Sequence, residues 1–230
     1  MSEAADSSSS GRTPEPSIAR STEPTADADP LSGSAVATRR GDDGSTGLLY
    51  GGDRIAKDDP RTEACGTVDE AVAALGLARA ELIAKADGGS LPPPLAGMAA
   101  LILRLQRELF VVAAELASNP AAWDRLRDGE TRVSIEMVDG LEAVLADLEA
   151  SIEMPREFVV PGETRLSATL ELARTILRRA ERRAVALDRA GLVPGEHLLP
   201  YLNRLSDLAW VLARAAEQGE LRRATPSRER

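Results

Sequence analysis

The amino-acid sequence predicts an all-α protein, built as a five-helix antiparallel bundle. Only 3% of the 230 residues are aromatic, which is too few for an ordinary β-sandwich or β-barrel. The apolar residues are mostly Ala and Leu, and the charged residues mostly Arg and Glu, all of which favour helices. The apolar residues also recur at steps of three and four, which is typical of helices that pack against neighbours at shallow angles.

Two segments that lack this period precede the predicted helices. Residues 1–34 are rich in Ser, Pro, Thr and Asp, and we expect a disordered tail because they offer little apolar surface to bury. Residues 35–62 carry glycines among arginines and Lys57, which predicts a basic, Gly-rich loop. We expect the loop and the bundle to form one domain over residues 35–220, followed by a disordered C-terminus at 221–230.

The first three helices are predicted over residues 63–86, from the prolines at 92–94 to Asn119, and over residues 134–153. Gly88 ends the first helix and the Asn119-Pro120 pair ends the second. Their apolar stripes are Val68, Val72, Leu75 and Leu82; then Met98, Ile102, Leu105, Leu109, Val112 and Leu116; then Met137, Leu141, Val144, Leu145 and Leu148.

The last two helices are predicted over residues 164–190 and 195–219, with Gly191 as the stop signal between them. The stripe of the fourth helix is Leu166, Leu170, Ala173, Leu177, Ala180, Ala184 and Leu187, and that of the fifth is Leu198, Leu202, Leu205, Ala209 and Leu212. No segment shows the sustained alternation of a half-buried strand.

Composition also excludes several classes of function. The net charge of −9 argues against a nucleic-acid partner, which normally selects a basic protein. One Cys and one His exclude an internal disulfide and a His-cluster metal site, so we expect no metal ligand among the protein side chains. No apolar run approaches the ~20 residues that span a bilayer. We therefore expect a cytoplasmic protein without a membrane partner.

Charged residues of the fourth helix lie at the edge of its apolar stripe. At about 100° per residue, Arg174, Arg178 and Glu181 fall within an arc of about 60° on that flank. Arginine side chains in such a place are partly desolvated and can bind phosphate through two parallel hydrogen bonds. The alternative is a solvated Arg/Glu face with i,i+4 pairs. The Gly-rich loop fits a polyphosphate site or a flexible surface loop, and it matches neither the Walker A nor the Rossmann fingerprint.

Ordered sequence blocks carry a resemblance to a known family. They are TRRGDDGST at 38–46, KDDPR at 57–61, GTVDE at 66–70, FVVPG at 158–162, ARTILRRAERR at 173–183 and YLNRLSD at 201–207. Together they resemble the PduO-type ATP:cob(I)alamin adenosyltransferases over roughly residues 35–217. Any one block would be a weak signal, whereas the set with compatible spacing is specific.

The resemblance implies a five-helix bundle that forms homotrimers, with active sites between adjacent subunits and an N-terminal loop folded over ATP. The residues it implies at ATP are Thr38, Arg39, Arg40, Gly41, Ser45, Thr46, Lys57, Arg178, Arg179, Glu181, Arg182 and Asn203. It implies that Asp69 and Arg174 form a pair between two subunits. It implies that Phe158 displaces the lower axial ligand of cobalt, and that Trp210 lies near the corrin.

The implied reaction moves the 5′-deoxyadenosyl group of ATP to the cobalt of cob(I)alamin or cob(I)yrinic acid a,c-diamide. Triphosphate is released and adenosylcobalamin, the coenzyme form of vitamin B12, is made. The implied catalytic residues are Asp69, Phe158, Arg174 and Arg178, and Mg²⁺ would enter through the ATP phosphates. A flavin- or flavodoxin-type reductase would supply electrons. Arg39 and Arg40 stand where the family usually has Lys and Thr, which changes the geometry of the phosphate donors.

Two other functions stay open on the sequence. A non-catalytic delivery or sensor protein could keep the same fold and bind the corrinoid or ATP without transfer. A helical scaffold with no ligand is the third, although it would not explain a basic Gly-rich loop on an acidic chain. The intact set of Arg174, Arg178, Glu181 and Asn203, together with Phe158, favours the enzyme.

Overall fold

The computed structural model describes residues 33–89, 91–157 and 159–217. By its internal contacts the chain divides into two compact units, Met1–Arg39 and Arg40–Arg230. In the first unit, the Ser34 hydroxyl accepts a hydrogen bond from the Ala37 backbone N–H at 2.9 Å. The predicted tails, residues 1–34 and 221–230, lie outside the described residues except for Gly33 and Ser34.

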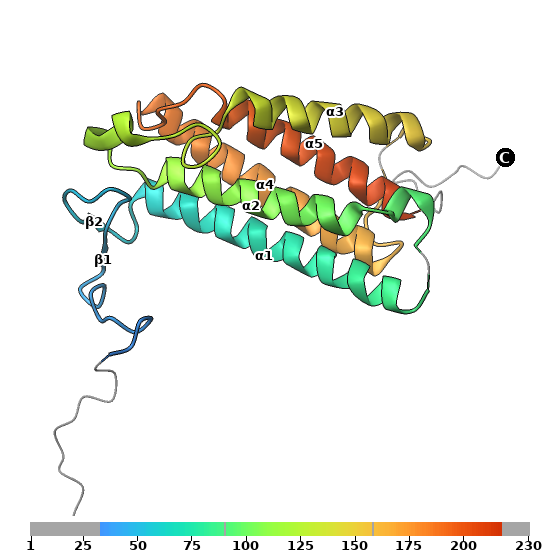
Figure 1. Ribbon diagram of the computed structural model, residues 1–230, viewed down its shortest axis with the longest axis horizontal. Helices are drawn as coiled ribbons and strands as arrows, with labels where there is room; N and C mark the ends of the chain where they lie inside the picture. Colours follow the sequence, from blue (N-terminus) through green and yellow to red (C-terminus); the bar gives the residue numbers. More distant parts are fainter. Residues whose placement is uncertain (1–32, 90, 158, 218–230) are drawn as a thin grey trace, which may run out of the picture. The chain divides into compact units, whose positions relative to one another are not determined.

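The second unit is mainly helical, as the sequence predicts (Figure 1). Its described part contains α1 (Pro60–Asp87), α2 (Met98–Leu116), α3 (Ile135–Ser151), α4 (Arg165–Arg189) and α5 (Leu198–Glu217). Two short 3-10 helices, η1 (Pro93–Leu95) and η2 (Pro120–Arg125), flank α2. Across the described ranges, no helix has both the length and the apolar character needed to cross a membrane.

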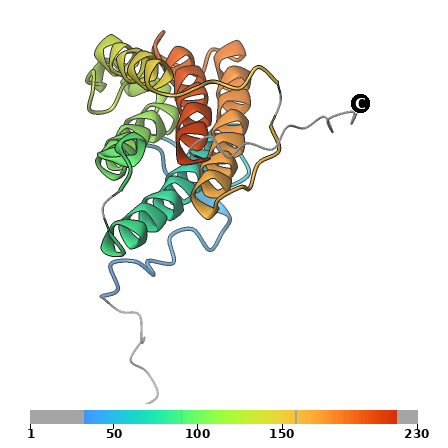
Figure 2. The same cartoon turned by 90° about the vertical axis from the view of Figure 1, so that its right-hand side faces the viewer.

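The helices pack side by side within this unit. α1 packs against α2 and α4, α5 packs against α4, and α3 packs against α5. Figure 1 shows that α1, α3 and α5 run in one direction and that α2 and α4 run in the other. The first three contacts therefore join antiparallel helices, whereas α3 and α5 are parallel neighbours. Figure 2 shows α5 lying between α3 and α4, so α5 is covered on two sides.

The predicted apolar stripes of α2, α4 and α5 are buried along their whole length. The stripe of α3 differs, because Leu141 is buried while Met137 and Leu148 are only partly covered. The main packing partner of α3 is α5, so the rest of its apolar face stays at the edge of the bundle. The period of a stripe therefore predicts which side chains share a face, and it does not predict how much of that face a neighbouring helix covers.

Helix α1 begins three residues before the predicted start at Glu63, since it starts at Pro60. Proline suits the first helical position because its missing N–H would have no partner there. Asp59 caps the helix, accepting from the Arg61 backbone N–H at 2.9 Å and from the Arg61 guanidinium at 3.0 Å on each carboxylate oxygen. These bonds lower the pKa of the Asp59 carboxyl. At the other end of the chain, α5 begins at Leu198 and not at Gly195.

Asp59→Ala should lower the free energy of unfolding by about 0.5–2 kcal/mol, the usual effect of losing an N-cap. Because the folded-state pKa of Asp59 is lowered, this contribution is present above the ordinary value of 3.8 and is lost as the pH falls through the folded-state pKa. Urea unfolding at pH 7 and at acid pH measures both effects. Asp58→Ala removes the neighbouring exposed carboxylate and serves as the control. Equal losses in the two variants would contradict the capping role.

The Gly-rich loop is more ordered than the sequence suggests. β1 (Ser45–Thr46) pairs antiparallel with β2 (Ile55–Ala56). The loop is also tied to the end of α2, where the Leu49 N–H donates to the Ala117 carbonyl at 2.8 Å. Strands of two residues are too short to show alternation in a sequence, so this pairing could not be predicted from the residue pattern.

Candidate functional site

Helix α4 divides its charged residues between two faces. Arg179 forms an ion pair with Glu70 of α1, and Arg183 forms one with Glu63 of α1 at 3.1 Å. Arg174 and Arg178 lie on the other side of the helix. The two faces match the angular positions predicted from the sequence. The pairing with α1 was not predicted, because it depends on which helix lies beside α4.

Two cavities lie on either side of Arg174 and Trp210. The first holds about 420 Å³ and is lined by Pro155, Arg156, Glu157, Val159, Pro161, Glu171, Arg174 and Trp210. The second holds about 320 Å³ and is lined by Leu145, Glu149, Arg174, Arg178, Ser206, Asp207, Trp210 and Val211. Arg178 is exposed in this single chain, whereas its place at the edge of the stripe predicted partial burial. The α4 flank that carries it borders a cavity, where none of the described helices covers it.

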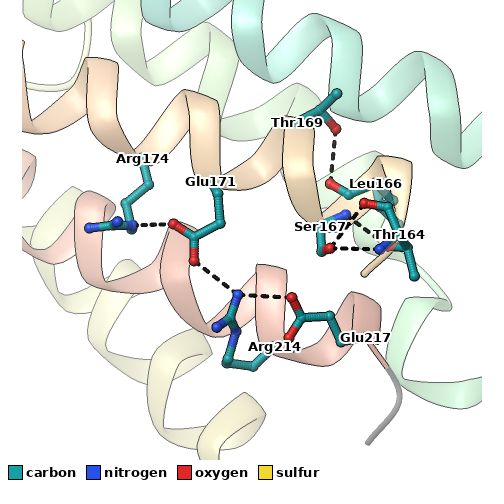
Figure 3. A network of polar contacts seen from close by, with 8 residues as sticks. All are labelled: Thr164, Leu166, Ser167, Thr169, Glu171, Arg174, Arg214 and Glu217. Atoms are coloured by element: carbon teal, nitrogen blue, oxygen red, sulfur yellow. Dashed lines mark hydrogen bonds and ion pairs between the residues drawn. The ribbon is translucent and has the colours of Figure 1, made fainter. Parts of the chain in front are cut away.

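A buried network of charges joins α4 to α5 behind these cavities (Figure 3). The Arg174 Nε donates to Glu171 Oε2 at 2.6 Å, and Arg214 Nη2 donates to Glu171 Oε1 at 2.9 Å. Arg214 Nη2 also donates to Glu217 Oε1 at 3.0 Å. Burial raises the pKa of the Glu217 carboxyl, and the charge of Arg214 opposes that shift. Three buried residues of this network could not be predicted from the sequence, because they lie off the apolar stripes of α4 and α5: Glu171, Arg214 and Glu217.

Glu181 of α4 and Asn203 of α5 are brought together, as the resemblance implies for residues of one site. The Asn203 side-chain N–H donates to Glu181 Oε1 at 3.2 Å, and Asn203 Oδ1 accepts from Arg204 Nη1 at 3.0 Å. The two side chains thereby hold each other in place. Arg182 lies exposed on the same helix as Glu181.

The loop residues of the second unit gather around one arginine. Arg54 donates through Nε to the Ser45 hydroxyl at 2.7 Å and through Nη2 to the Arg40 carbonyl at 2.7 Å. A Cβ added to Gly41 would lie 2.9 Å from Lys57 Nζ, so glycine lets the Lys57 ammonium approach the backbone. Thr46 lies in β1 beside Ser45. Arg54 was not singled out from the sequence, since nothing in the residue order marks which cation the loop folds around.

The remaining predicted residues belong to other parts of the chain. Thr38 and Arg39 belong to the first unit, where Arg39 has a φ of 56° and Thr38 N–H donates to the Val36 carbonyl at 3.0 Å. Asp69 is exposed on α1. Among the described residues Arg174 forms its ion pair with Glu171 and not with Asp69. Phe158 lies outside the described residues.

Comparisons with known proteins agree on one family. A sequence model described as cobalamin adenosyltransferase matches residues 36–216. A corrinoid adenosyltransferase of Citrobacter freundii is 39% identical over 182 residues, which cover 79% of this chain and 94% of that protein. The corrinoid adenosyltransferase PduO of Salmonella typhimurium is 38% identical over 183 residues, which cover 80% of this chain and 50% of that protein.

The solved structures include a variant of a PduO-type ATP:corrinoid adenosyltransferase from Lactobacillus reuteri, complexed with cobalamin and ATP. It superposes on this chain with a TM-score of 0.68 and 27% sequence identity. The superposition covers 82% of this chain and 94% of that one.

Proposed function

This chain belongs to the cobalamin adenosyltransferase family, and we propose from this premise that it transfers the 5′-deoxyadenosyl group of ATP to the cobalt of a reduced corrinoid. It is an ATP:corrinoid adenosyltransferase and releases triphosphate. The observation that carries this function is the family match over residues 36–216, which includes every residue of the site described above except Glu217. The corrinoid would be cob(I)alamin or cob(I)yrinic acid a,c-diamide.

The corrinoid is proposed to bind at the larger of the two cavities beside Arg174 and Trp210. The larger cavity is lined by Val159 and Pro161, which belong to the same sequence block as Phe158. Its indole, valine and proline surfaces suit the apolar face of a corrin ring. Phe158 is proposed to exclude the lower axial ligand of cobalt, and Asp69 is proposed to pair with Arg174 of an adjacent subunit.

ATP is proposed to bind the loop and the cationic flank of α4. The proposed contacts are Thr38, Arg39, Arg40, Gly41, Ser45, Thr46, Lys57, Arg178, Arg179, Glu181, Arg182 and Asn203. Apart from Glu181, these residues offer backbone N–H, hydroxyl, amide or cationic groups, which bind phosphate oxygens. The ion pair with Glu70 would have to open before Arg179 could reach a phosphate.

The donor set fits Mg²⁺ that arrives on the ATP phosphates, because most of these residues offer cationic or N–H groups, which are ligands for phosphate. When bound, Mg²⁺ would supply positive charge to the phosphate oxygens of the leaving group. The protein's own cations would hold the same triphosphate in a fixed position.

The bond change needs positioning and no general base. The electron pair of Co(I) forms the bond to C5′ of ATP, and the bond from C5′ to the phosphate oxygen breaks with its electrons on triphosphate. Arg178 and the loop cations are proposed to hold that triphosphate in line with the attack. Loss of the lower ligand makes Co(II) easier to reduce, which is the task proposed for Phe158.

The oligomeric state, the electron donor and the cellular compartment are proposed from the same family membership. We propose that the five helices form the bundle of the family, in which α3 and α5 are parallel neighbours, that residues 35–220 are its domain, and that three copies form the active sites between them. A flavin- or flavodoxin-type reductase would deliver the electrons in the cytoplasm. Size measurement by light scattering tests the trimer.

Transfer is tested by mixing the protein with ATP, Mg²⁺ and chemically reduced cobalamin and following the absorbance of adenosylcobalamin. Product in amounts above the protein concentration supports the enzyme. Binding of both substrates without any product would overturn the enzyme and leave the delivery or sensor protein as the alternative. Binding of neither would point to a scaffold.

Deleting residues 2–32 should leave turnover and assembly mass within error of the full chain. The family match begins at residue 36, and the composition of the deleted segment offers no apolar anchor for the site. Steady-state kinetics and light scattering on both proteins make the comparison. A large loss of activity would assign the segment a role in catalysis.

A further inference from the structure

Arg214 is a residue of α5 whose positively charged side chain lies buried inside the bundle. Its side chain is 1% exposed, and its Nη2 donates to carboxylates on two helices, Glu171 of α4 and Glu217 of α5. A buried guanidinium is costly unless carboxylates pair with it. The network is electrically balanced, because the two carboxylates face the two guanidinium groups of Arg174 and Arg214.

This network reaches both cavities through two of their lining residues. Glu171 uses one carboxylate oxygen for Arg214 and the other for Arg174 Nε (Figure 3). The Arg214 guanidinium carbon also lies 5.4 Å from the centroid of the Trp210 ring, within the range of a cation–π contact. Arg174 and Trp210 line both cavities. One buried arginine therefore contacts one lining residue directly and holds the other through Glu171.

We propose that Arg214 is a positioning residue for adenosyl transfer, which aligns Arg174 through Glu171 and Trp210 through its own guanidinium. This inference rests on the proposed function. Glu171 holds Arg174 by its Nε, and Arg174 lines both cavities. Without the Arg214 guanidinium, the buried Glu171 carboxylate would lose one of its two hydrogen-bond partners. It would then hold the Arg174 side chain in a less fixed position.

The proposal differs from a purely structural role in what it predicts for the two substrates. A structural ion network would affect unfolding and leave the kinetic constants of the folded protein alone. A positioning network acts on the cavity that is proposed for the corrinoid. A change in this network should therefore alter kcat/KM for the corrinoid much more than the KM for ATP.

The test compares Arg214→Lys and Glu171→Gln with the parent protein. Lysine keeps the charge but lacks the planar guanidinium that lies over the Trp210 indole. Glutamine keeps the volume of Glu171 and removes its charge. Arg165→Met is the matched control, because Arg165 forms an exposed pair with Glu81 at 2.8 Å and lies in neither cavity. All rates are measured with Co(I)alamin supplied, below the lowest melting temperature of the set.

We expect both network variants to lower kcat/KM for the corrinoid by about tenfold, since small misplacements at a reacting centre can cost up to about a hundredfold. The KM for ATP should stay within about twofold, and Arg165→Met should match the parent. If Arg214→Lys does not fold, Glu171→Gln decides alone. Melting temperatures that fall with unchanged kinetics would overturn the positioning role. A parent without transfer activity would overturn the proposed function, and this inference with it.

Discussion

Phe158→Ala is expected to slow adenosyl transfer on the order of a hundredfold when the reaction starts from Co(II)alamin, which is about 2.7 kcal/mol of barrier. The proposed task of the ring is to keep the lower ligand away from cobalt, and Co(II) is hard to reduce while that ligand remains. The effect should be much smaller when Co(I)alamin is supplied, because Co(I) has no axial ligand to displace. The ratio of the two rates is therefore the measurement.

Val160→Ala is the matched control for this variant. Val160 lies two residues further along the chain, is 48% exposed and does not line the larger cavity, in contrast to Val159 and Pro161. It should leave the ratio of the two rates unchanged. The absorption spectrum of enzyme-bound Co(II)alamin adds a second reading, since Phe158→Ala should retain the band of the ligand-bound cobalt.

The alternative role for Phe158 is that of an apolar plug in the segment before α4. A buried plug would lose about 3–5 kcal/mol of stability on truncation to alanine. It would also lower both rates alike, because the whole site would be disturbed. Equal losses in the two assays with a lower melting temperature would overturn the ligand-exclusion role.

Arg178→Ala is expected to raise the KM for ATP or lower kcat/KM for ATP by roughly ten- to a hundredfold. Arg178 lines the cavity of about 320 Å³, beside Arg174. A charge-assisted hydrogen bond to phosphate contributes about 1.5–3 kcal/mol, and each 1.4 kcal/mol is about tenfold in rate or affinity. Because Arg178 is exposed in the single chain, the full effect requires that ATP or a second copy cover it.

Steady-state kinetics with each substrate varied in turn measure this effect. Arg189→Ala removes another exposed arginine of α4, in its last turn, and should leave both substrates unaffected. The KM for the corrinoid should change little in Arg178→Ala. An unchanged KM and kcat/KM for ATP, or an effect confined to the corrinoid, would contradict the assignment of Arg178 to the nucleotide site.

The presence of a helix and the identity of its buried residues could be predicted from the sequence wherever the apolar stripe was long. The stripe from Leu166 to Leu187 repeats for more than five turns, and all of its members are buried in α4. Such a stripe is a local property, since the 3.6-residue period alone puts these side chains on one face. The start of α1 was readable in principle as well, because Asp59-Pro60 combines an N-cap with a proline that suits the first turn.

Site residues could be predicted from the sequence only where they stand in contiguous sequence blocks. Arg174, Arg178 and Glu181 share a flank of one helix, so their angles follow from their spacing. Arg54 holds Ser45 and Arg40 in the loop, and no periodic pattern marks it. Phe158 was identified by its block, and its placement lies outside the described residues.

The sequence by itself determined the helical class, the buried stripes and the family, because each depends on neighbours along the chain. Only the tertiary structure decided which charges meet. Arg179 and Glu70 are 109 residues apart, and Glu171 and Arg214 are 43 apart. The same helices in another packing order would bring other side chains together, since a helix face specifies what is buried and not which helix covers it. That choice depends on the packing of α4 against α1 and α5 and places Arg214 behind Arg174 and Trp210.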